Sequence, residues 1–349
     1  MSDFHALKIS ETKQVTPTSV AVTFEVPQAL KTTFSFIAGQ YITLNHTING
    51  DKVRRAYSIC SAPSSGLLTV GIKKVENGTF SVYANEQLAV GDVLEVMPPQ
   101  GTFTFKPNSQ EAHHIAAFAA GSGITPILSI AQTALEQQSN STFLLVYGNQ
   151  TKKEAMFYEA IEQLRAQFPE RFFVEYIYSR SQETNAARGR IDKNVVSYYL
   201  TNKYKQTRFE DFYVCGPEAM IDEVSNTLVA SGVSKQQIHF ELFTTSQGAV
   251  SEAVQDGTTS ISIIVDQVTE TFTMAQNKTI LEVALEKQLD APYSCQGGIC
   301  SSCIGRVTQG KAQMRQNQIL TDSEVAEGLV LTCQAHPVTS TLVLDYDDI

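Results

Sequence analysis

Four cysteines constrain the fold of this chain more than any other feature of its sequence. Cys295, Cys300 and Cys303 lie within the segment SCQGGICSSC, and Cys333 stands alone further along. Two adjacent glycines inside the segment lack side chains and allow positive φ angles, as a tight loop requires. Three thiols on one loop therefore need a fourth thiol that a separate part of the fold brings to them.

The spacing C-x4-C-x2-C followed by a distant cysteine predicts a plant-type [2Fe–2S] cluster held by Cys295, Cys300, Cys303 and Cys333. A zinc site more often has C-x2-C pairs on both sides of its loop. Purely structural cysteines leave three thiols on one glycine-rich loop unexplained. Both of these readings remain alternatives to the cluster.

The composition is that of a packed globular protein with two or three domains. The 349 residues are 42% hydrophobic and 18% charged. The net charge of −10 argues against a nucleic-acid partner, because such partners are bound by basic surfaces. The most apolar stretch, residues 115–128, is interrupted by glycines and a proline, so we expect no membrane partner. The N-terminus lacks a secretory signal, and we expect a cytoplasmic protein without a disulfide framework.

Three patterns follow one another and predict a multidomain protein. Residues 1–108 contain short apolar or alternating segments separated by turn residues, typical of an antiparallel β-barrel or sandwich. In residues 109–243, apolar strands alternate with helices, which predicts an α/β doubly wound parallel sheet with helices on both faces. Residues 244–260 are rich in Ser, Thr and Gly and fit a flexible linker. Residues 261–349 begin with a hairpin and a helix and then contain the cysteines.

The individual elements are also predicted. The expected strands cover residues 20–26, 41–45, 55–60, 67–73, 93–97, 115–120, 143–147, 172–178, 212–215, 261–268 and 270–274. The expected helices cover residues 126–137, 153–167, 218–231 and 281–289. A further helix is expected to open at Thr321, which forms a capping box with Glu324.

Two loops at strand ends predict a nucleotide site. AAGSGITPI, residues 119–127, places two glycines between a strand and a helix whose N-terminus offers N–H groups to a pyrophosphate. YVCGPEAMI, residues 213–221, ends another strand, and ligands of doubly wound sheets bind at the carboxyl ends of strands. The alternatives are glycines that serve packing only and a Cys215 that is a small buried hydrophobe. The candidate residues are Gly121, Gly123, Thr125, Pro126, Cys215, Gly216 and Pro217.

Two segments of the first region offer groups to a flavin. In RAYSIC, Arg55 and Tyr57 share one face of the expected strand while Ser58 points elsewhere, because strand side chains alternate. In NGTFS, a turn leads into an expected helix start, where Ser81 and backbone N–H groups are available to an anion. The alternative is a surface strand on which arginine and tyrosine are common.

Taken in order, these motifs resemble the ferredoxin–NADP reductase superfamily with a plant-type ferredoxin fused at the C-terminus. RAYS and GTFS look like its two flavin motifs, GSGITP like its pyridine-nucleotide loop and CGP like its nicotinamide-side motif. HFELF is similar to the segment that closes the site behind the flavin. Within the superfamily, RRAYSIC, LEVMPPQGTF, YGN, GRID and LTCQAHPVTS resemble the reductase subunits of phenylacetyl-CoA epoxidases. The resemblance covers essentially the whole chain and implies a flavin β-barrel, a nucleotide domain and an α+β β-grasp ferredoxin domain.

The resemblance also implies residue roles. It implies FAD, with FMN as the less favoured flavin. It assigns the flavin phosphate and ring to Arg55, Ala56, Tyr57 and Ser58, and the pyrophosphate to Gly78, Thr79 and Ser81. It lines the dinucleotide site with Gly121, Gly123, Thr125, Pro126, Cys215, Gly216 and Pro217. It places Ser58, Cys215 and Glu241 at the hydride-transfer centre.

The choice between NADPH and NADH depends on the segment that follows the strand 172–178. Arginine suits the 2′-phosphate of NADPH through paired, charge-assisted hydrogen bonds. The candidates are Ser179, Arg180, Arg188 and Arg190. A solvated basic loop is the alternative, and we predict NADPH with NADH as the second choice.

The predicted function is electron transfer from NADPH through FAD and the cluster to the oxygenase component of a multicomponent system. The resemblance favours a di-iron oxygenase, that of phenylacetyl-CoA epoxidase. The alternatives are a Rieske oxygenase, a steroid hydroxylase or a hybrid-cluster protein as acceptor, or a redox-sensing binding protein. From Thr258 onward 11 acidic and 5 basic residues give a charge of 5 − 11 = −6. These acids form either a docking surface for a basic partner or a solvated face.

Overall fold

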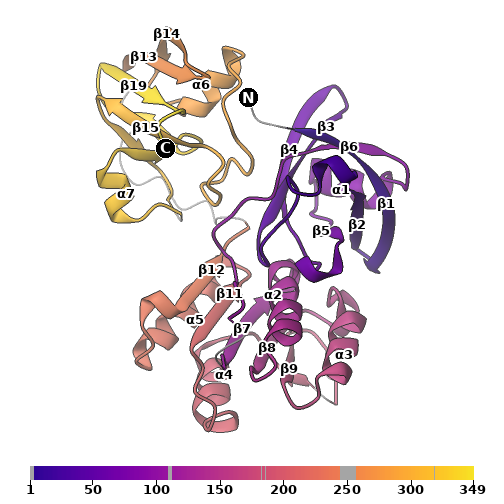
Figure 1. Cartoon of the computed structure of the whole chain (residues 1–349). Coiled ribbons are helices and arrows are strands. Elements are labelled where there is room, and N and C mark those ends of the chain that lie inside the picture. The colour runs from indigo at the N-terminus through magenta and orange to yellow at the C-terminus, as the bar shows by residue number, and fades with distance from the viewer. Residues whose placement is uncertain (1–3, 109–111, 182, 185, 244–256, 318) are drawn as a thin grey trace. The chain divides into compact units, whose positions relative to one another are not determined.

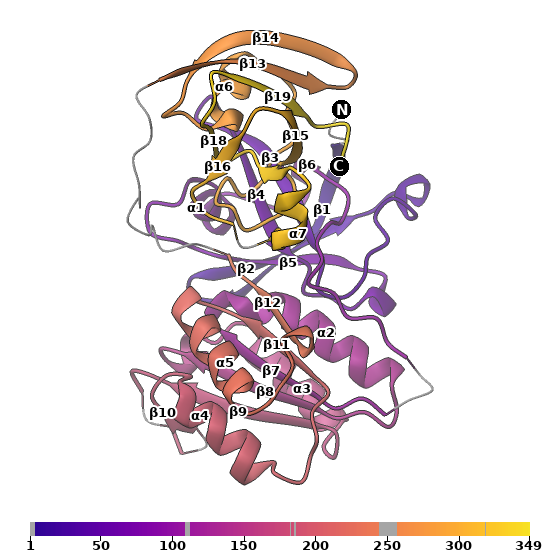
Figure 2. The same ribbon diagram turned by 90° about the vertical axis from the view of Figure 1, so that its left-hand side faces the viewer.

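The computed structural model describes residues 4–108, 112–181, 183–184, 186–243, 257–317 and 319–349. These residues form two compact units, 4–243 and 257–349. Most of the predicted linker, residues 244–256, lies outside the described residues. Its final residues, 258–260, belong to a strand. Figures 1 and 2 show the two units, and each is treated by itself below.

The first part of the larger unit is a six-stranded antiparallel barrel. Its strand order is β4-β3-β6-β1-β2-β5, and a bridge between Ile59 and Val70 joins the two outer strands. The strands are β1 (His5–Thr16), β2 (Ser19–Glu25), β3 (Tyr41–Ile48), β4 (Asp51–Ser58), β5 (Leu68–Lys73) and β6 (Val93–Val96). The helical segments are η1 (Gln28–Leu30), η2 (Pro63–Ser65) and α1 (Thr79–Glu86). The barrel prediction is confirmed.

The second part of the larger unit is a parallel sheet of order β10-β9-β8-β7-β11-β12. The chain runs from the central β7 outward through β8 and β9, and then returns to β11 on the other side of β7. The strands are β7 (Ile115–Ala120), β8 (Phe143–Asn149), β9 (Phe172–Tyr178), β10 (Ala186–Arg188), β11 (Asp211–Cys215) and β12 (Ile238–Glu241). This reversal of direction between β7 and β11 is where doubly wound sheets bind ligands.

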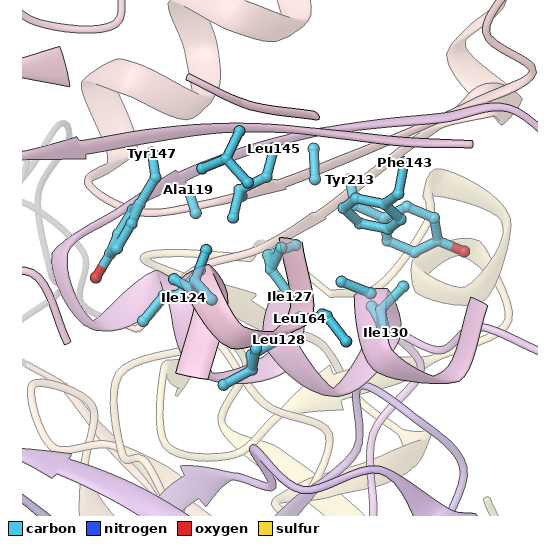
Figure 3. Packing of buried hydrophobic residues seen from close by; sticks show 14 of the residues in the cluster. Ala119, Ile124, Ile127, Leu128, Ile130, Phe143, Leu145, Tyr147, Leu164 and Tyr213 are labelled. Atoms are coloured by element: carbon cyan, nitrogen blue, oxygen red, sulfur yellow. The ribbon is translucent and has the colours of Figure 1, made fainter. Parts of the chain in front are cut away.

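Helices cover both faces of this sheet, as predicted. One face packs against α2, whose Ile124, Ile127 and Ile130 point at the sheet in Figure 3. The helices of that face are α2 (Ile124–Gln137) and α3 (Tyr158–Gln167), with η3 (Gly121–Gly123) and η4 (Lys152–Glu154) before them. The remaining helical segments are α4 (Lys193–Tyr198), η5 (Tyr199–Lys203), α5 (Glu218–Ala230) and η6 (Lys235–Gln237).

The predicted helix 153–167 is wrong over its first turns. Ala155 and Met156 are 2% and 0% exposed, and Phe157 adopts a φ of 58°. Burial of these side chains against the sheet draws the backbone out of the helical conformation. The helix α3 therefore starts only at Tyr158.

The smaller unit has the β-grasp arrangement that was predicted. Its sheet has the order β14-β13-β19-β15-β17, and a separate pair joins β16 to β18. The central pair β13–β19 is parallel, whereas β13 and β14 form an antiparallel hairpin. The strands are β13 (Thr258–Val265), β14 (Val268–Ala275), β15 (Ile304–Gln309), β16 (Ala312–Met314), β17 (Leu329–Leu331), β18 (Ala335–Pro337) and β19 (Thr341–Asp345). The helices are α6 (Ile280–Glu286) and α7 (Asp322–Ala326).

Two boundaries in this unit differ from the prediction. The hairpin turn lies at Asp266 and Gln267, which have φ angles of 51° and 63°, so Val268 belongs to the second strand and not the first. The helix α6 ends three residues before the predicted Leu289, because Gln288 takes a left-handed conformation with φ 61°. The predicted capping box is present, with Glu324 N–H donating to Thr321 Oγ1.

Candidate active site and cluster loop

The two nucleotide loops meet at the sheet reversal. A Cβ atom on Gly123 would lie 2.1 Å from the carbonyl oxygen of Cys215. A Cβ on Gly216 would lie 3.1 Å from that of Ala120. Side chains at either position would force the loops apart, so glycine is required for this close approach. The expectation that both loops face one place is confirmed.

The first of these loops is held from behind. Gly121 has a φ of +56°, and its carbonyl accepts a hydrogen bond of 3.0 Å from the Tyr147 hydroxyl. Thr125 is 1% exposed, and its hydroxyl donates to the Ser122 carbonyl at 3.0 Å. Pro126 is also buried. Thr125 and Pro126 therefore support the loop, whereas Gly121 and the N-terminus of α2 are placed to meet an anion.

Sequence reasoning missed Lys73, a cation beside this loop. Lys73 is the final residue of the barrel strand β5, and its Nζ lies 3.7 Å from the position of a Cβ on Gly121. The close packing of β5 on the loop explains the contact, since a Cβ on Gly71 would lie 2.7 Å from Thr125 Cγ2. Lys73 and Gly121 lie 48 positions apart in sequence, and no local pattern joins them.

The three residues expected at the hydride-transfer centre come together. Ser58, at the end of β4, donates a hydrogen bond of 3.0 Å from Oγ to Glu241 Oε2. Glu241 pairs with Cys215 across the β11–β12 ladder. Cys215 is fully buried, and burial, followed by the Glu241 charge, raises the pKa of its thiol well above its usual value. Cys215 is therefore a neutral thiol at physiological pH.

The flavin candidates occupy one side of the barrel. Arg55 is exposed, and its guanidinium donates to the Arg54 carbonyl at 2.7 Å. Tyr57 and Ala56 are half-buried, and the Tyr57 ring lies 5.6 Å from that of Phe80. Burial raises the pKa of the Tyr57 phenol, against the lowering effect of the Arg55 charge. The neutral phenol and a charged guanidinium on one strand face fit a ring with a phosphate attached.

The second flavin motif forms a helix start, as predicted. Gly78 precedes α1, and a Cβ there would lie 2.4 Å from Ser81 Oγ. Ser81 Oγ accepts the Val75 N–H at 3.1 Å, while Thr79 is exposed at the first helical position. The folded-back Ser81 and the absent side chain of Gly78 leave backbone close to the surface, which fits a pyrophosphate.

The 2′-phosphate candidates gather at the end of β9. Ser179 N–H donates to the Asn149 carbonyl, and Arg180 N–H to the Gln150 carbonyl, at 3.0 and 2.8 Å. The next strand, β10, was not predicted, and it pairs Arg188 with Tyr178. The side chains of three arginines are exposed there: Arg180, Arg188 and Arg190.

The four predicted cluster cysteines come together in the smaller unit. Cys300, Cys303 and Cys333 are 5%, 1% and 6% exposed, and Cys295 is half-buried. Thiol contacts run from Cys300 to Cys295, from Cys295 to Cys333 and from Cys333 to Cys303. The hydrogen bond to Cys295, followed by burial, raises the pKa of the Cys300 thiol. Iron must therefore displace protons on binding.

The loop around these thiols fits a cluster. Gly297 N–H donates to Cys295 Sγ at 3.3 Å, and Gly298 has a φ of +73°. The Gln334 amide donates to the Gln296 carbonyl at 3.1 Å and to Cys333 Sγ at 3.9 Å. Such donors to sulfur tune the potential of an iron–sulfur cluster. Within the described ranges, no three His, Cys, Asp or Glu side chains are grouped to hold a single metal ion.

A second set of bonds supports one ligand from below. Thr332 donates from both its N–H and its hydroxyl to the Cys303 carbonyl, at 3.0 and 2.9 Å. The buried Tyr346 hydroxyl in turn donates to Thr332 Oγ1 at 2.8 Å. The position of Cys303 is thus fixed by residues next to Cys333 and β19.

The acidic residues expected as a docking surface also make contacts inside this unit. Asp347 accepts N–H groups from Asp266 and Gln267 at 3.0 and 2.7 Å. Asp348 pairs with Arg306 at 3.3 Å, and Glu324 closes the capping box. A local structural role thus accounts for part of the charge.

Comparison with known proteins agrees with this geometry. Three family models match successive parts of the chain: an oxidoreductase FAD-binding domain over residues 6–105, an oxidoreductase NAD-binding domain over 118–226 and a 2Fe-2S iron-sulfur cluster binding domain over 263–338. The chain therefore binds FAD, a nicotinamide nucleotide and a [2Fe–2S] cluster. No helix in the described part of the chain is both long and apolar enough to cross a membrane.

The relatives and solved structures are oxygenase partners or share their fold. One component of the 1,2-phenylacetyl-CoA epoxidase of Escherichia coli (strain K12) is 36% identical over 351 residues, which are 99% of each chain. The ferredoxin reductase component of 3-ketosteroid-9-alpha-monooxygenase of Rhodococcus rhodochrous is 30% identical and covers 97% of this chain and 96% of its own. The structure of phthalate dioxygenase reductase matches 98% of both chains with a TM-score of 0.63 at 24% identity, which shows the fold. This chain belongs to the ferredoxin–NADP reductase superfamily, as a reductase component of an oxygenase system with FAD-, NAD- and [2Fe–2S]-binding domains.

Proposed function

We propose that this chain passes electrons from NADPH, through FAD and the [2Fe–2S] cluster, to the di-iron oxygenase component of a phenylacetyl-CoA epoxidase. The observation that carries the proposal is the meeting of Ser58, Cys215 and Glu241 beside the two glycine loops. These residues come from a barrel strand and two sheet strands, and the nicotinamide and the flavin have to meet where the two folds join. The domains we propose are residues 1–108 for the flavin, 109–243 for the nucleotide and 261–349 for the cluster, with a linker at 244–260.

The bound groups supply the redox chemistry: the nicotinamide gives a hydride, the flavin accepts it, and the cluster passes on single electrons. The chain supplies orientation. Ser58 and the neutral Cys215 thiol present small polar groups to the stacked rings, and Glu241 holds the Ser58 hydroxyl in one direction. Arg55 and Tyr57 hold the flavin phosphate and ring edge, and Gly78, Thr79 and Ser81 its pyrophosphate.

The nucleotide preference we propose rests on three exposed arginines. Arg180, Arg188 and Arg190 lie at the end of β9 and beside it, and none of them makes an ion pair with another described residue. Their charge is therefore available to a dianion such as the 2′-phosphate. Ser179 adds a hydroxyl at the same strand end.

The acceptor we propose follows from the full-length similarity to the Escherichia coli epoxidase component. The steroid monooxygenase reductase is a weaker match over nearly the same length, so a steroid oxygenase is the second choice. We propose a cytoplasmic location, in keeping with six cysteines that are all free thiols.

The test is an anaerobic absorbance titration of the purified holoprotein with NADPH and, separately, NADH. We expect the flavin band to take up two electrons and the cluster band one, with NADPH reducing the protein at the lower concentration. The reduced protein is then mixed with a purified epoxidase oxygenase component and a steroid oxygenase component. Faster reoxidation by the steroid component would overturn the acceptor, and a preference for NADH would overturn the arginine assignment.

A further inference from the structure

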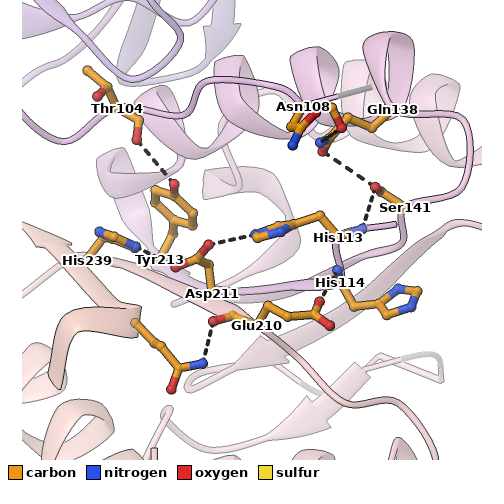
Figure 4. Close-up of polar contacts among 11 residues, drawn as sticks. Thr104, Asn108, His113, His114, Gln138, Ser141, Glu210, Asp211, Tyr213 and His239 are labelled. Carbon is orange, nitrogen blue, oxygen red and sulfur yellow. Dashed lines mark hydrogen bonds and ion pairs between the residues drawn. The ribbon is translucent and has the colours of Figure 1, made fainter. Parts of the chain in front are cut away.

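A buried polar cluster lies at the beginning of β11, away from the loop that follows this strand. The Asp211 carboxylate accepts one hydrogen bond from His113 Nε2 at 2.6 Å and another from His239 Nε2 at 2.7 Å. Figure 4 shows the two rings approaching the carboxylate from opposite sides. Both ring nitrogens carry hydrogen here, because an ionised carboxylate only accepts.

The two histidines belong to segments that lead to different parts of the active site. His239 is on β12, and Glu241 follows two residues later on the same strand face. His113 is in the connection that enters β7 from the barrel, which carries Ser58. A single carboxylate therefore holds both segments that supply the Ser58–Glu241 hydrogen bond.

Tyr213 completes the contact on the same face of β11. Its ring stacks on that of His239, with centroids 4.7 Å apart and an interplanar angle of 24°. Its hydroxyl donates to the Thr104 carbonyl at 3.2 Å. Tyr213 also pairs with His239 in the strand ladder, two residues before Cys215 pairs with Glu241.

The register of β12 needs such a constraint. β12 has four residues and lies at the edge of the sheet, so a single ladder fixes it. A slip of one residue would turn Glu241 to the other face of the sheet. The Asp211–His239 hydrogen bond exists in only one register, because it joins side chains from two strands.

We propose that Asp211 is a positioning residue, which fixes β12 through His239 so that Glu241 faces Ser58 and Cys215. The inference rests on the proposed role of Glu241 in hydride transfer. Asp211 and His239 act through Glu241 and do not touch the reacting rings. Their effect on the rate is therefore not independent of Glu241.

The experiment measures anaerobic flavin reduction by NADPH in a stopped-flow instrument, using holoprotein variants. The variants are His239→Leu, His239→Gln, Glu241→Gln and the double variant His239→Leu with Glu241→Gln. The matched control is His114→Leu, since His114 lies beside His113 but bonds Thr142 at 2.8 Å and not Asp211. Flavin content, iron content and thermal unfolding are measured for each variant.

We expect His239→Leu to slow flavin reduction roughly tenfold without raising the KM for NADPH, since a misplacement of about 1 Å can cost up to about 10²-fold. His239→Gln keeps a donor for Asp211 and should retain most of the rate, as should the control. The double variant should be no slower than Glu241→Gln alone, because the two changes remove one effect.

Rates that multiply in the double variant would overturn the positioning role, and so would a fully active His239→Leu. If His239→Leu fails to fold, the comparison passes to His239→Gln and Asp211→Asn, and equal loss in the His114 control would overturn the proposal. A Glu241→Gln variant with the normal rate would instead refute the proposed role of Glu241, which is a separate result.

Discussion

Lys73 is a binding candidate that becomes visible only in the folded chain. Its ammonium group stands beside Gly121, at the loop where a pyrophosphate is expected. A hydrogen bond to a charged group contributes about 1.5–3 kcal/mol, so Lys73→Ala should raise the KM for the nicotinamide nucleotide roughly tenfold or more with little change in kcat. Steady-state reduction of an artificial acceptor measures both constants.

Lys74→Ala is the matched control for Lys73→Ala. Lys74 is the next residue and forms an exposed ion pair with Glu86. Surface pairs of this kind contribute about 0–1 kcal/mol, and we expect normal kinetics. Equal KM values for the two variants would remove Lys73 from the site.

Two neighbouring glycines in the cluster loop differ in what they tolerate. A Cβ on Gly298, where φ is +73°, would lie 2.9 Å from Gln334 Cγ, whereas a Cβ on Gly297 meets nothing nearer than 3.8 Å. A strained residue of this kind costs about 1–3 kcal/mol. We expect Gly298→Ala to lower the iron content and hasten bleaching of the cluster band in air, and Gly297→Ala to behave like the wild type. The reverse order would contradict the strain argument.

At the scale of secondary structure, prediction succeeded where the pattern was local and apolar. The strand β7 begins and ends at the predicted residues, because six apolar residues, nearly all buried, are followed by a glycine turn. The strand β1 was missed, since its sequence HALKISETKQVT is mostly polar and mostly not buried. The turn at Asp266 and Gln267 was misplaced because neither residue is glycine, although both have positive φ.

Contacts between elements were the part of the site that the sequence did not predict. The loops and the Ser58–Cys215–Glu241 set were expected because their motifs are contiguous. The Asp211 cluster was not, since its histidines come from 98 positions before it and 28 after it. Only the parallel pairing of β11 with β7 and β12 brings these side chains together.

The Asp211 cluster also predicts how acid affects the elements that it joins. Burial alone would raise the pKa of Asp211, but hydrogen bonds from His113 and His239 hold it well below its usual value. A lowered carboxyl pKa stabilises the folded state above the unfolded value of about 3.9 and loses that effect as the pH falls further. The melting temperature of Asp211→Asn should therefore lie below that of the wild type at pH 6, and the difference should shrink toward pH 3. Circular dichroism measures it, and a constant difference would contradict the assignment.

At the scale of the whole molecule, hydride uptake and one-electron output belong to different compact units. Replacing one cluster ligand should therefore separate the two activities. We expect Cys333→Ser to lose most cluster absorbance and reduction of the protein acceptor, while NADPH still bleaches the flavin at the normal rate. Loss of flavin bleaching in a variant with full FAD content would show that the units are not separable in this way.

The support beneath Cys303 has a consequence for how the protein is made. The strand β19 lies inside the smaller sheet, between β13 and β15, and Tyr346 beside it fixes Thr332 and through it Cys303. During synthesis the cysteine loop leaves the ribosome before this strand exists. The nascent chain then exposes three thiols on a loop without its framework, open to oxidation and to the wrong metal. Iron and sulfide delivery has to wait for residues 341–346, and the cell has to keep those thiols reduced until then.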